Sequence, residues 1–375
     1  MISLHIGINA LYLIPGGVGG SETYLRNLMR ALAALDTPHR FTLFTNRETD
    51  REVAPHHPAW QVRQTAVRAR HRPARLIYEQ TILPLRCAGL DVLFCPGFTA
   101  PALAPCPAVT TIHDLQHKRH PEYFRWFERP FWRYFVWQAV HTSARLIALS
   151  EQTRAGLLHS YSIREDKVEV VAHGVEQEFF SVGALRRRRS PEPVLLCPST
   201  THPHKNHALL LKCFRRFSAA HPDWQLVLTG VRGFADRMVR EQVAALGLEP
   251  RVRILGWLPR EELYHWFERA GALVYPSTFE GFGLPVVEAL AAGLPVACSD
   301  IEPLRTIAGD AAVLFDPASE SDMLQALERV SSDQPLRARL AQAGPLRAAQ
   351  FTWRQCAQQT LAILVQAAGH SRPGA

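Results

Sequence analysis

Short apolar runs alternate with longer amphipathic stretches along most of this chain. The runs are rich in β-branched residues, and the stretches between them carry apolar side chains at the spacing of an α-helix. In the first half of the chain, the predicted strands are residues 3–8, 41–45, 92–95, 108–112, 145–149 and 168–171. Short strands that alternate with helices indicate a parallel α/β sheet.

The same alternation starts again in the second half of the chain. Its predicted strands are residues 193–197, 225–229, 252–255, 273–275, 295–298 and 312–315. A chain of 375 residues is also too long for one compact core. We therefore expect two doubly wound, Rossmann-like α/β domains at 1–173 and 174–350, followed by a packing helix within 351–375.

The domain boundary is expected near His173-Gly174-Val175, shortly before four arginines at 186–189. Runs of like charge are usually solvated. We therefore interpret this run as an exposed linker ahead of the second domain's first strand, and we assign it no function.

The segment after the predicted strand at 273–275 combines glycines with a helix start. Residues 280–288 read Glu-Gly-Phe-Gly-Leu-Pro-Val-Val-Glu. Pro285 suits the first turn of a helix, and Gly281 and Gly283 let backbone amides approach a ligand closely. Because unpaired amides and the helix dipole both favour an anion, a diphosphate would fit near Gly283 and Leu284.

Two carboxylates flank this predicted anion site. Glu280 lies before the helix, and Glu288 lies one turn inside it. Carboxylates accept hydrogen bonds from hydroxyl groups, such as those of a sugar ring and a ribose. For the segment taken alone, the alternative is that Glu280 caps the helix and Glu288 is solvated.

A second glycine loop follows the first predicted strand and contains Gly16, Gly17, Gly19 and Gly20. It precedes a helix that Ser21 could cap, and its amides could approach a phosphate or an acceptor. The glycines form two doublets rather than the Gly-x-Gly-x-x-Gly pattern, and no acidic residue ends a second strand at the right place. A nicotinamide cofactor is therefore disfavoured.

Two further residues stand near strand ends. His113 follows the strand at 108–112, so it should emerge at the carboxyl edge of the first sheet, where open α/β folds bind ligands. A lone histidine is more often structural, and this chain has 17 histidines. Lys205 follows the strand that ends at Cys197, so its ammonium could neutralise a departing diphosphate.

These motifs combine into the pattern of a known family. The Glu-x7-Glu spacing of Glu280 and Glu288, with Gly-Phe-Gly-Leu-Pro inside it, resembles that of the family 4 retaining glycosyltransferases of the GT-B fold. The loop at 15–25 resembles their glycine-rich loop, and Thr111-Ile-His-Asp resembles their His-Asp segment. Pro203-His-Lys-Asn-His is similar to the Lys-Asn element of a subset rich in mannosyl- and deoxyhexosyltransferases. The resemblance extends across nearly the whole chain.

The resemblance implies a fold and a set of site residues. Two Rossmann-like domains would face each other across a cleft, and the C-terminal helix would cross back to the first domain. The first domain would bind the acceptor, and the second would bind the nucleotide sugar. The implied catalytic residues are His113, Lys205 and Glu280, with His113 against the donor sugar. The implied donor-binding residues are Gly16, Gly17, Gly19, Gly20, Asn206, Gly281, Phe282, Gly283, Leu284 and Glu288.

The resemblance also implies a mechanism, in which the acceptor attacks from the front face and the leaving phosphate accepts its proton. Glu288 would hold the ribose, and Glu280 would hold sugar hydroxyls. No metal and no cofactor beyond the nucleotide sugar is expected, because cationic side chains and helix amides can do a metal's work. Many relatives carry an arginine shortly before Lys205, whereas residues 199–204 contain none, so their cationic pair is not expected here.

We therefore expect a hexosyltransferase that moves mannose or a deoxyhexose from a nucleotide diphosphate sugar, with a GDP-sugar as the first choice. The acceptor would be a glycan or a lipid-linked saccharide in cell-surface polysaccharide biosynthesis. One alternative is a nucleotide-sugar epimerase of similar architecture, and another is a glycosyltransferase-like binding module without catalysis. Nucleic acid is not an expected partner, because no nucleic-acid-binding module is recognisable.

Positive charge gathers in the first half of the chain. Residues 1–172 hold 20 basic and 14 acidic side chains, a balance of +6, whereas 173–375 hold 22 and 20, a balance of +2. A basic face attracts polyanions. The aromatic and basic segment at 123–137 suits a membrane interface, but its aromatics could equally pack a helix on the sheet. Much of the remaining charge comes from Arg63, Arg68, Arg70, Arg72 and Arg75.

The cysteines and the N-terminus bear on location. Seven scattered cysteines without a Cys-x-x-Cys pair indicate a reducing compartment, and the first residues lack the pattern of a signal peptide. Prolines interrupt the uncharged stretch at 92–112, so it is expected to form strand, loop and strand rather than a membrane span. We expect a cytoplasmic protein, with peripheral contact to the anionic inner face of the plasma membrane.

Overall fold

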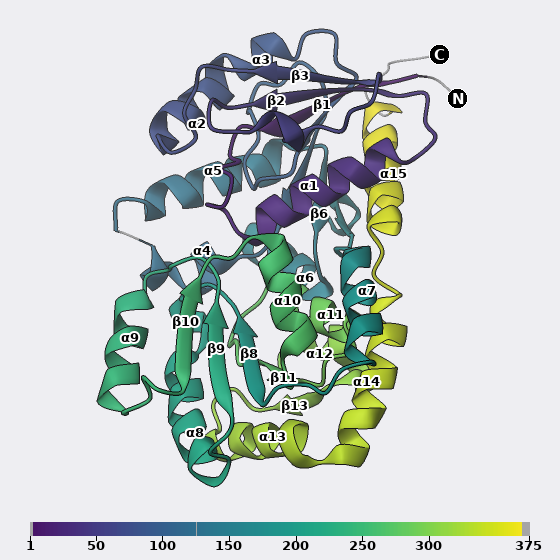
Figure 1. Ribbon diagram of the computed structural model, residues 1–375. Helices are drawn as coiled ribbons and strands as arrows, with labels where there is room; N and C mark the ends of the chain where they lie inside the picture. The colour runs from purple at the N-terminus through teal and green to yellow at the C-terminus, as the bar shows by residue number, and fades with distance from the viewer. Residues whose placement is uncertain (1–2, 125, 370–375) are drawn as a thin grey trace. The chain divides into compact units, whose positions relative to one another are not determined.

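A computed structural model describes residues 3–124 and 126–369 of the chain (Figure 1). The chain forms two compact units. The first unit comprises Met1–Gly174 and Trp353–Ala375, and the second comprises Val175–Thr352. The chain thus enters the second unit one residue later than the boundary expected after residue 173, and it returns to the first unit at Trp353.

The first unit is built on a seven-stranded sheet in the order β3-β2-β1-β4-β5-β6-β7, and every neighbouring pair is parallel. Its strands are β1 (His5–Ala10), β2 (Arg40–Thr45), β3 (Trp60–Gln64), β4 (Val92–Cys95), β5 (Ala108–Ile112), β6 (Arg145–Ala148) and β7 (Val168–Val170). The direction of winding reverses between β1 and β4. Open parallel sheets bind ligands at such a reversal, at the carboxyl ends of the strands.

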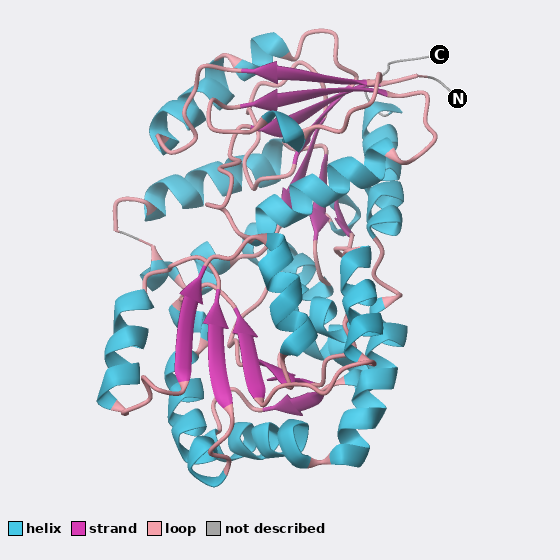
Figure 2. Ribbon diagram, in the orientation of Figure 1, coloured by secondary structure: helices cyan, strands magenta, loops and turns pink. Residues whose placement is uncertain are grey.

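Helices pack against this sheet (Figure 2). They are α1 (Gly20–Ala33), α2 (Arg72–Thr81), α3 (Leu83–Arg86), α4 (Gln116–Arg119), α5 (Arg129–Thr142), α6 (Glu151–Tyr161) and the C-terminal α15 (Trp353–Gly369). Helix α15 packs along α1 and reaches β4, β5 and β6. The prediction that the C-terminal helix returns to the first domain is confirmed for 353–369, and residues 370–375 lie outside the described part of the chain.

The second unit has a six-stranded parallel sheet in the order β10-β9-β8-β11-β12-β13, with a reversal between β8 and β11. Its strands are β8 (Val194–Pro198), β9 (Gln225–Thr229), β10 (Val252–Gly256), β11 (Ala272–Tyr275), β12 (Val296–Ser299) and β13 (Val313–Phe315). Its helices are α7 (Gln177–Arg186), α8 (His207–Ala220), α9 (Asp236–Ala245), α10 (Arg260–Arg269), α11 (Leu284–Ala291), α12 (Leu304–Ala308), α13 (Glu320–Ser332) and α14 (Gln334–Ala348). The predicted parallel α/β fold is confirmed in both units.

The arginine run at 186–189 is not the plain exposed linker that the sequence suggested. Arg186 is the last residue of α7, and its Nη1 donates to the carbonyls of Phe267, Glu268 and Ala270 at 2.6, 2.7 and 2.8 Å. These carbonyls lie at the C-terminal end of α10. A cation stabilises this end because it satisfies free carbonyls and opposes the negative end of the helix dipole. Only the three arginines that follow Arg186 are exposed, so the first member of the run is structural.

Across residues 3–124 and 126–369, we find no helix with both the length and the apolar character needed to cross a bilayer.

Candidate functional site

The glycine loop of the second unit leads directly into α11. Gly283 caps the helix with a φ of 120°, and a Cβ atom there would lie 2.4 Å from Cδ2 of Leu304. Both the backbone conformation and this close approach require glycine. Pro285 lies in the first turn, as predicted from the sequence. The amides of Val286 and Val287 bond to the Gly283 carbonyl, which leaves the positive end of the helix at Gly283 and Leu284.

Two of the predicted catalytic residues meet beside this helix start. Lys205 follows β8 and ends a short 3₁₀ turn, whereas Glu280 follows β11. The Lys205 ammonium donates to Oε1 of Glu280 at 2.5 Å and to the hydroxyl of Tyr275 at 3.0 Å. The side chains of Lys205 and Glu280 are only 13% and 10% exposed. The reversal between β8 and β11 therefore brings a cation and a carboxylate to the carboxyl edge of the sheet.

The backbone fixes the loops that carry this pair. The Thr278 amide donates to the carbonyl of His204 at 2.7 Å, which ties the Glu280 loop to the Lys205 turn. Asn206 adopts a left-handed φ of 57° at the start of α8, and its side-chain amide donates to the carbonyl of Pro317 at 2.9 Å. Asn206 thus braces the turn, while its role as a donor contact stays a prediction.

Glu288 lies one turn into α11 and is buried, so the alternative of a solvated residue is wrong. Its Oε1 lies 2.9 Å from Nη2 of Arg260, which is also 2.8 Å from Glu176. Burial raises the pKa of Glu288 although Arg260 acts in the opposite direction. Burial by itself would lower the pKa of Arg260, but the carboxylates of Glu288 and Glu176 outweigh this effect and raise the pKa above its ordinary value. A ribose would have to share Glu288 with this guanidinium.

Phe282 and Leu284 differ in their surroundings. The Phe282 ring is buried, and its centroid lies 5.9 Å from that of Phe351 in an edge-on contact. Leu284 is half-buried at the first position of α11. Packing accounts for Phe282, and its role as a donor contact stays a prediction.

His113 lies in the first unit, directly after β5, as expected. Its Nε2–H donates to the carbonyl of Pro96 at 2.7 Å, and the rings of Tyr24 and Phe98 lie 5.1 and 5.0 Å from its own. Burial lowers the pKa of His113 to about 4. The imidazole is therefore neutral near pH 7, and it acts as a hydrogen-bonding group rather than a cation.

The glycine loop of the first unit is tightly held. Gly16 and Gly19 have φ values of 67° and 59°, and Gly19, not Ser21, caps α1. The Gly16 amide donates to Oε2 of Glu22 at 2.8 Å, so this amide is already used. The Ser21 hydroxyl donates to the Val18 carbonyl instead of capping the helix. Gly17 is closely packed, because a Cβ there would lie 2.9 Å from Ile14, and Gly20 is the first residue of α1.

The predicted site residues therefore form two groups. Lys205, Asn206, residues 280–284 and Glu288 gather around the edge between β8 and β11, while the first glycine loop and His113 belong to the first sheet. Two family models match the chain along the same division. The model described as Glycosyltransferase Family 4 matches residues 18–179, and that described as Glycosyl transferases group 1 matches residues 185–347. The chain belongs to the family 4 glycosyltransferases.

Similar proteins agree with this assignment. The glycosyltransferase is 29% identical over 273 residues to O-antigen chain mannosyltransferase B of Escherichia coli, a match of 68% of this chain and 69% of that one. It is 34% identical over 244 residues to a D-inositol 3-phosphate glycosyltransferase of Frankia alni, which covers 60% of this chain. That match spans only 59% of the Frankia protein.

Solved structures show the same fold. The structure of HepE from Anabaena in complex with UDP and glucose superposes with a TM-score of 0.76 at 19% identity. The superposition covers 96% of this glycosyltransferase and 99% of HepE. The predicted GT-B fold is confirmed.

Sequence reasoning missed a buried polar cluster in the first unit of the glycosyltransferase. Glu79 on α2 is 1% exposed, and its Oε2 accepts hydrogen bonds from Asn9 and Thr99, each at 3.0 Å. Arg75, one turn earlier, is also buried, whereas the sequence shows it only as one of the arginines that supply the charge of the first half. Asn9 lies near the end of β1, and Thr99 lies in the loop that follows β4, so both are close to the point where the sheet reverses. The spacing of Arg75 and Glu79 on one helix face was the available signal.

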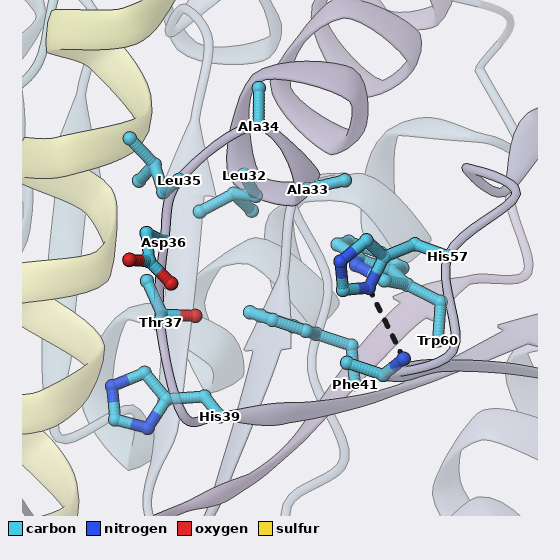
Figure 3. Close-up of a pocket in the computed structure, with 11 residues that line it drawn as sticks. Leu32, Ala33, Ala34, Leu35, Asp36, Thr37, His39, Phe41, His57 and Trp60 are labelled. Carbon is cyan, nitrogen blue, oxygen red and sulfur yellow. Dashed lines mark hydrogen bonds between the residues drawn. The ribbon is translucent and has the colours of Figure 1, made fainter.

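A pocket of about 250 Å³ lies at the opposite edge of the first sheet, between the end of α1 and the starts of β2 and β3 (Figure 3). The rings of Phe41 and Trp60 stack there with centroids 4.4 Å apart. None of the predicted site residues lines it, so the glycosyltransferase motifs do not explain this pocket.

Proposed function

We propose that this protein is a retaining hexosyltransferase that moves mannose or a deoxyhexose from a GDP-sugar to a glycan or lipid-linked saccharide acceptor. The observation that carries the proposal is the pair formed by Lys205 and Glu280 beside the first turn of α11. A diphosphate at that turn would meet the helix amides, and the sugar attached to it would meet a carboxylate.

The leaving group develops negative charge as the glycosidic bond to phosphate breaks. Lys205 is held by both Glu280 and Tyr275, so its ammonium is already oriented when that charge appears. We propose that Lys205 and the amides of Gly283 and Leu284 carry this charge without a metal ion. The acceptor oxygen forms a bond to the anomeric carbon as the bond from that carbon to the phosphate breaks. The proton of the acceptor hydroxyl passes to the departing phosphate.

The remaining groups would bind hydroxyls. Glu280 would accept from the sugar, and Glu288, oriented by Arg260, would accept from the ribose. His113 would contact the sugar as a neutral group, because its low pKa prevents it from competing with Lys205 for the phosphate. The first unit would supply the acceptor side, and its buried Glu79 cluster is the candidate there.

The choice of mannose is supported by the similarity to the Escherichia coli mannosyltransferase and by the Pro-His-Lys-Asn-His motif. The pathway would accordingly be cell-surface polysaccharide biosynthesis. The similarity to the Frankia D-inositol 3-phosphate glycosyltransferase favours a second candidate, transfer to a phosphorylated polyol. The excess of positive charge in residues 1–172 suits such an acceptor.

A thermal-shift titration with GDP-mannose, GDP-fucose, UDP-glucose and free GDP tests the donor assignment. We expect GDP-mannose or GDP-fucose to raise the melting temperature more than UDP-glucose does, because a ligand stabilises the state it binds. A larger shift with UDP-glucose would contradict the nucleotide assignment. Isomerisation of the donor without an acceptor would favour an epimerase, and binding without transfer or hydrolysis would favour a non-catalytic module.

A further inference from the structure

The chain crosses between its two units at two peptide bonds. The first crossing lies between Gly174 and Val175, and the second lies between Thr352 and Trp353. The backbone at the two crossings is paired, because the Val175 amide donates to the carbonyl of Phe351 at 3.0 Å and Val175 forms a parallel bridge with Thr352. The side chains beside the two bonds are therefore carried by a short, hydrogen-bonded stretch of backbone.

On the side of the second unit, Phe351 contacts the glycine loop before α11. Its ring lies 5.9 Å from that of Phe282 in an edge-on arrangement. The Arg347 guanidinium lies 5.5 Å from the centre of the Phe351 ring and donates to a backbone carbonyl of α12 at 2.9 Å. Helix α12 in turn packs Leu304 against the same glycine loop. Phe351 is thus attached to this loop both directly and through α12.

On the side of the first unit, His173 and Trp353 belong to a group of buried rings around His113. The rings of His173 and Trp353 stack with centroids 5.7 Å apart. Tyr24 on α1 stacks on His173 at 4.8 Å and meets His113 edge-on at 5.1 Å. The Tyr24 hydroxyl also lies 3.2 Å from Oγ1 of Thr111, two residues before His113. The packing around His113 therefore includes one residue from each crossing.

We propose that Phe351 and Trp353 are positioning residues that couple the glycine loop before α11 to His113. They lie two residues apart, one in each unit, so a change in the loop that moves Phe351 also moves Trp353. The rings of His173 and Tyr24 pass this movement to His113, because closely packed side chains shift together. Filling the loop with nucleotide would thus set the His113 ring for the sugar. The inference rests on the proposed function, which takes this loop as the nucleotide site.

The test is the nuclear magnetic resonance signal of the His113 ring in protein with isotope-labelled histidine. Spectra are recorded without nucleotide and with saturating GDP or UDP, whichever binds more tightly, and His113→Gln identifies the signal by its loss. Neither nucleotide carries the sugar that His113 would contact. We expect the nucleotide to shift the His113 signal in the unaltered chain. Phe351→Leu should lose most of this shift, and Phe351→Tyr, which keeps a ring, should retain it.

Calorimetry on the same proteins separates binding from coupling. Phe351→Leu should weaken nucleotide binding by only about two- to tenfold, the contribution of one aromatic pair, so its site can still be saturated. Phe282→Leu removes the other ring of this contact and should reduce the His113 shift in the same way. The matched control is Leu346→Ala, because Leu346 lies on α14 shortly before Phe351 and is 76% exposed. We expect this control to keep both the affinity and the shift.

Two results would overturn the coupling and leave the proposed function standing. One is a His113 signal that does not move although calorimetry shows nucleotide binding to the unaltered chain. The other is a full shift in saturated Phe351→Leu and Phe282→Leu variants whose thermal melting shows that they are folded. Binding of neither nucleotide to the unaltered chain would contradict the proposed function and this inference together.

Discussion

Lys205 and Glu280 lie 75 residues apart in the chain, yet the Lys205 ammonium is 2.5 Å from a carboxylate oxygen of Glu280. Their strands, β8 and β11, are neighbours at the reversal of the second sheet. The sequence suggested separate roles for the two residues, one on phosphate and one on sugar. Their contact means that each orients the other before the donor arrives.

Replacing Lys205 should weaken the binding of nucleoside diphosphates. Charge-assisted hydrogen bonds contribute about 1.5–3 kcal/mol, so Lys205→Met should reduce the affinity for GDP by about ten- to a hundredfold. Isothermal titration calorimetry measures this affinity. Lys212→Met on the exposed side of α8 is the control, with no expected effect. Equal affinities for GDP in the two variants would show that Lys205 does not meet the diphosphate.

Gly283 should be required for both its conformation and its space. Gly283→Ala places a Cβ against Leu304 at a φ of 120°, and we expect a loss of about 1–3 kcal/mol of stability together with weaker donor binding. Gly247→Ala separates the two causes, because Gly247 has a φ of 65° and no atom within 4 Å of the added Cβ. Urea denaturation of both variants tests this. If Gly247→Ala destabilises as much, the Leu304 contact is unimportant.

The Arg260–Glu288 pair should contribute to stability chiefly because Glu288 is buried. Arg260→Met would leave a buried carboxylate without its cation, and such losses cost about 3–5 kcal/mol. Adding Glu288→Met should recover part of this loss. The midpoint of urea unfolding reports the stability of both variants. Arg215→Met is the control, because Arg215 is exposed on α8. A midpoint unchanged by Arg260→Met would contradict this account.

His113 should make stability depend on pH. Its pKa is lowered by burial from 6.5 to about 4, so between these values the unfolded chain binds more protons than the folded one. Stability is therefore fully present above pH 6.5 and falls as the pH drops toward 4, by about 3 kcal/mol for this residue. His113→Gln should flatten that part of the pH profile. A profile as steep as that of the unaltered chain would show that His113 does not titrate in this way.

Much of the fold could be predicted because its strands are short, apolar and buried on both faces. Strand β3 was missed because four of its five residues, from Gln61 to Gln64, are exposed at the sheet edge and carry no apolar run. The Gly283 loop could be predicted because a strand, glycines and Pro285 define it locally.

The partners of buried charges could not be predicted, because they depend on tertiary packing. The Arg260 side chain reaches Glu288 from a different helix, and nothing in the sequence around either residue signals this pairing. The same holds for Arg186, which looked like part of a solvated run but donates hydrogen bonds to the carbonyls at the end of α10. Local patterns thus located the glycine loop before α11, while the structure supplied the contacts that orient the carboxylates of Glu280 and Glu288.

We propose that the Lys205–Glu280 pair forms the catalytic centre of sugar transfer. The most direct test is the initial rate of mannosyl transfer from GDP-mannose to a membrane-derived saccharide acceptor, by the unaltered chain and by Glu280→Gln. Glu249→Gln, an exposed acid in the same unit, is the control. We predict that Glu280→Gln lowers the rate at least about a hundredfold while the control keeps it. Full turnover by a folded Glu280→Gln variant would contradict the claim.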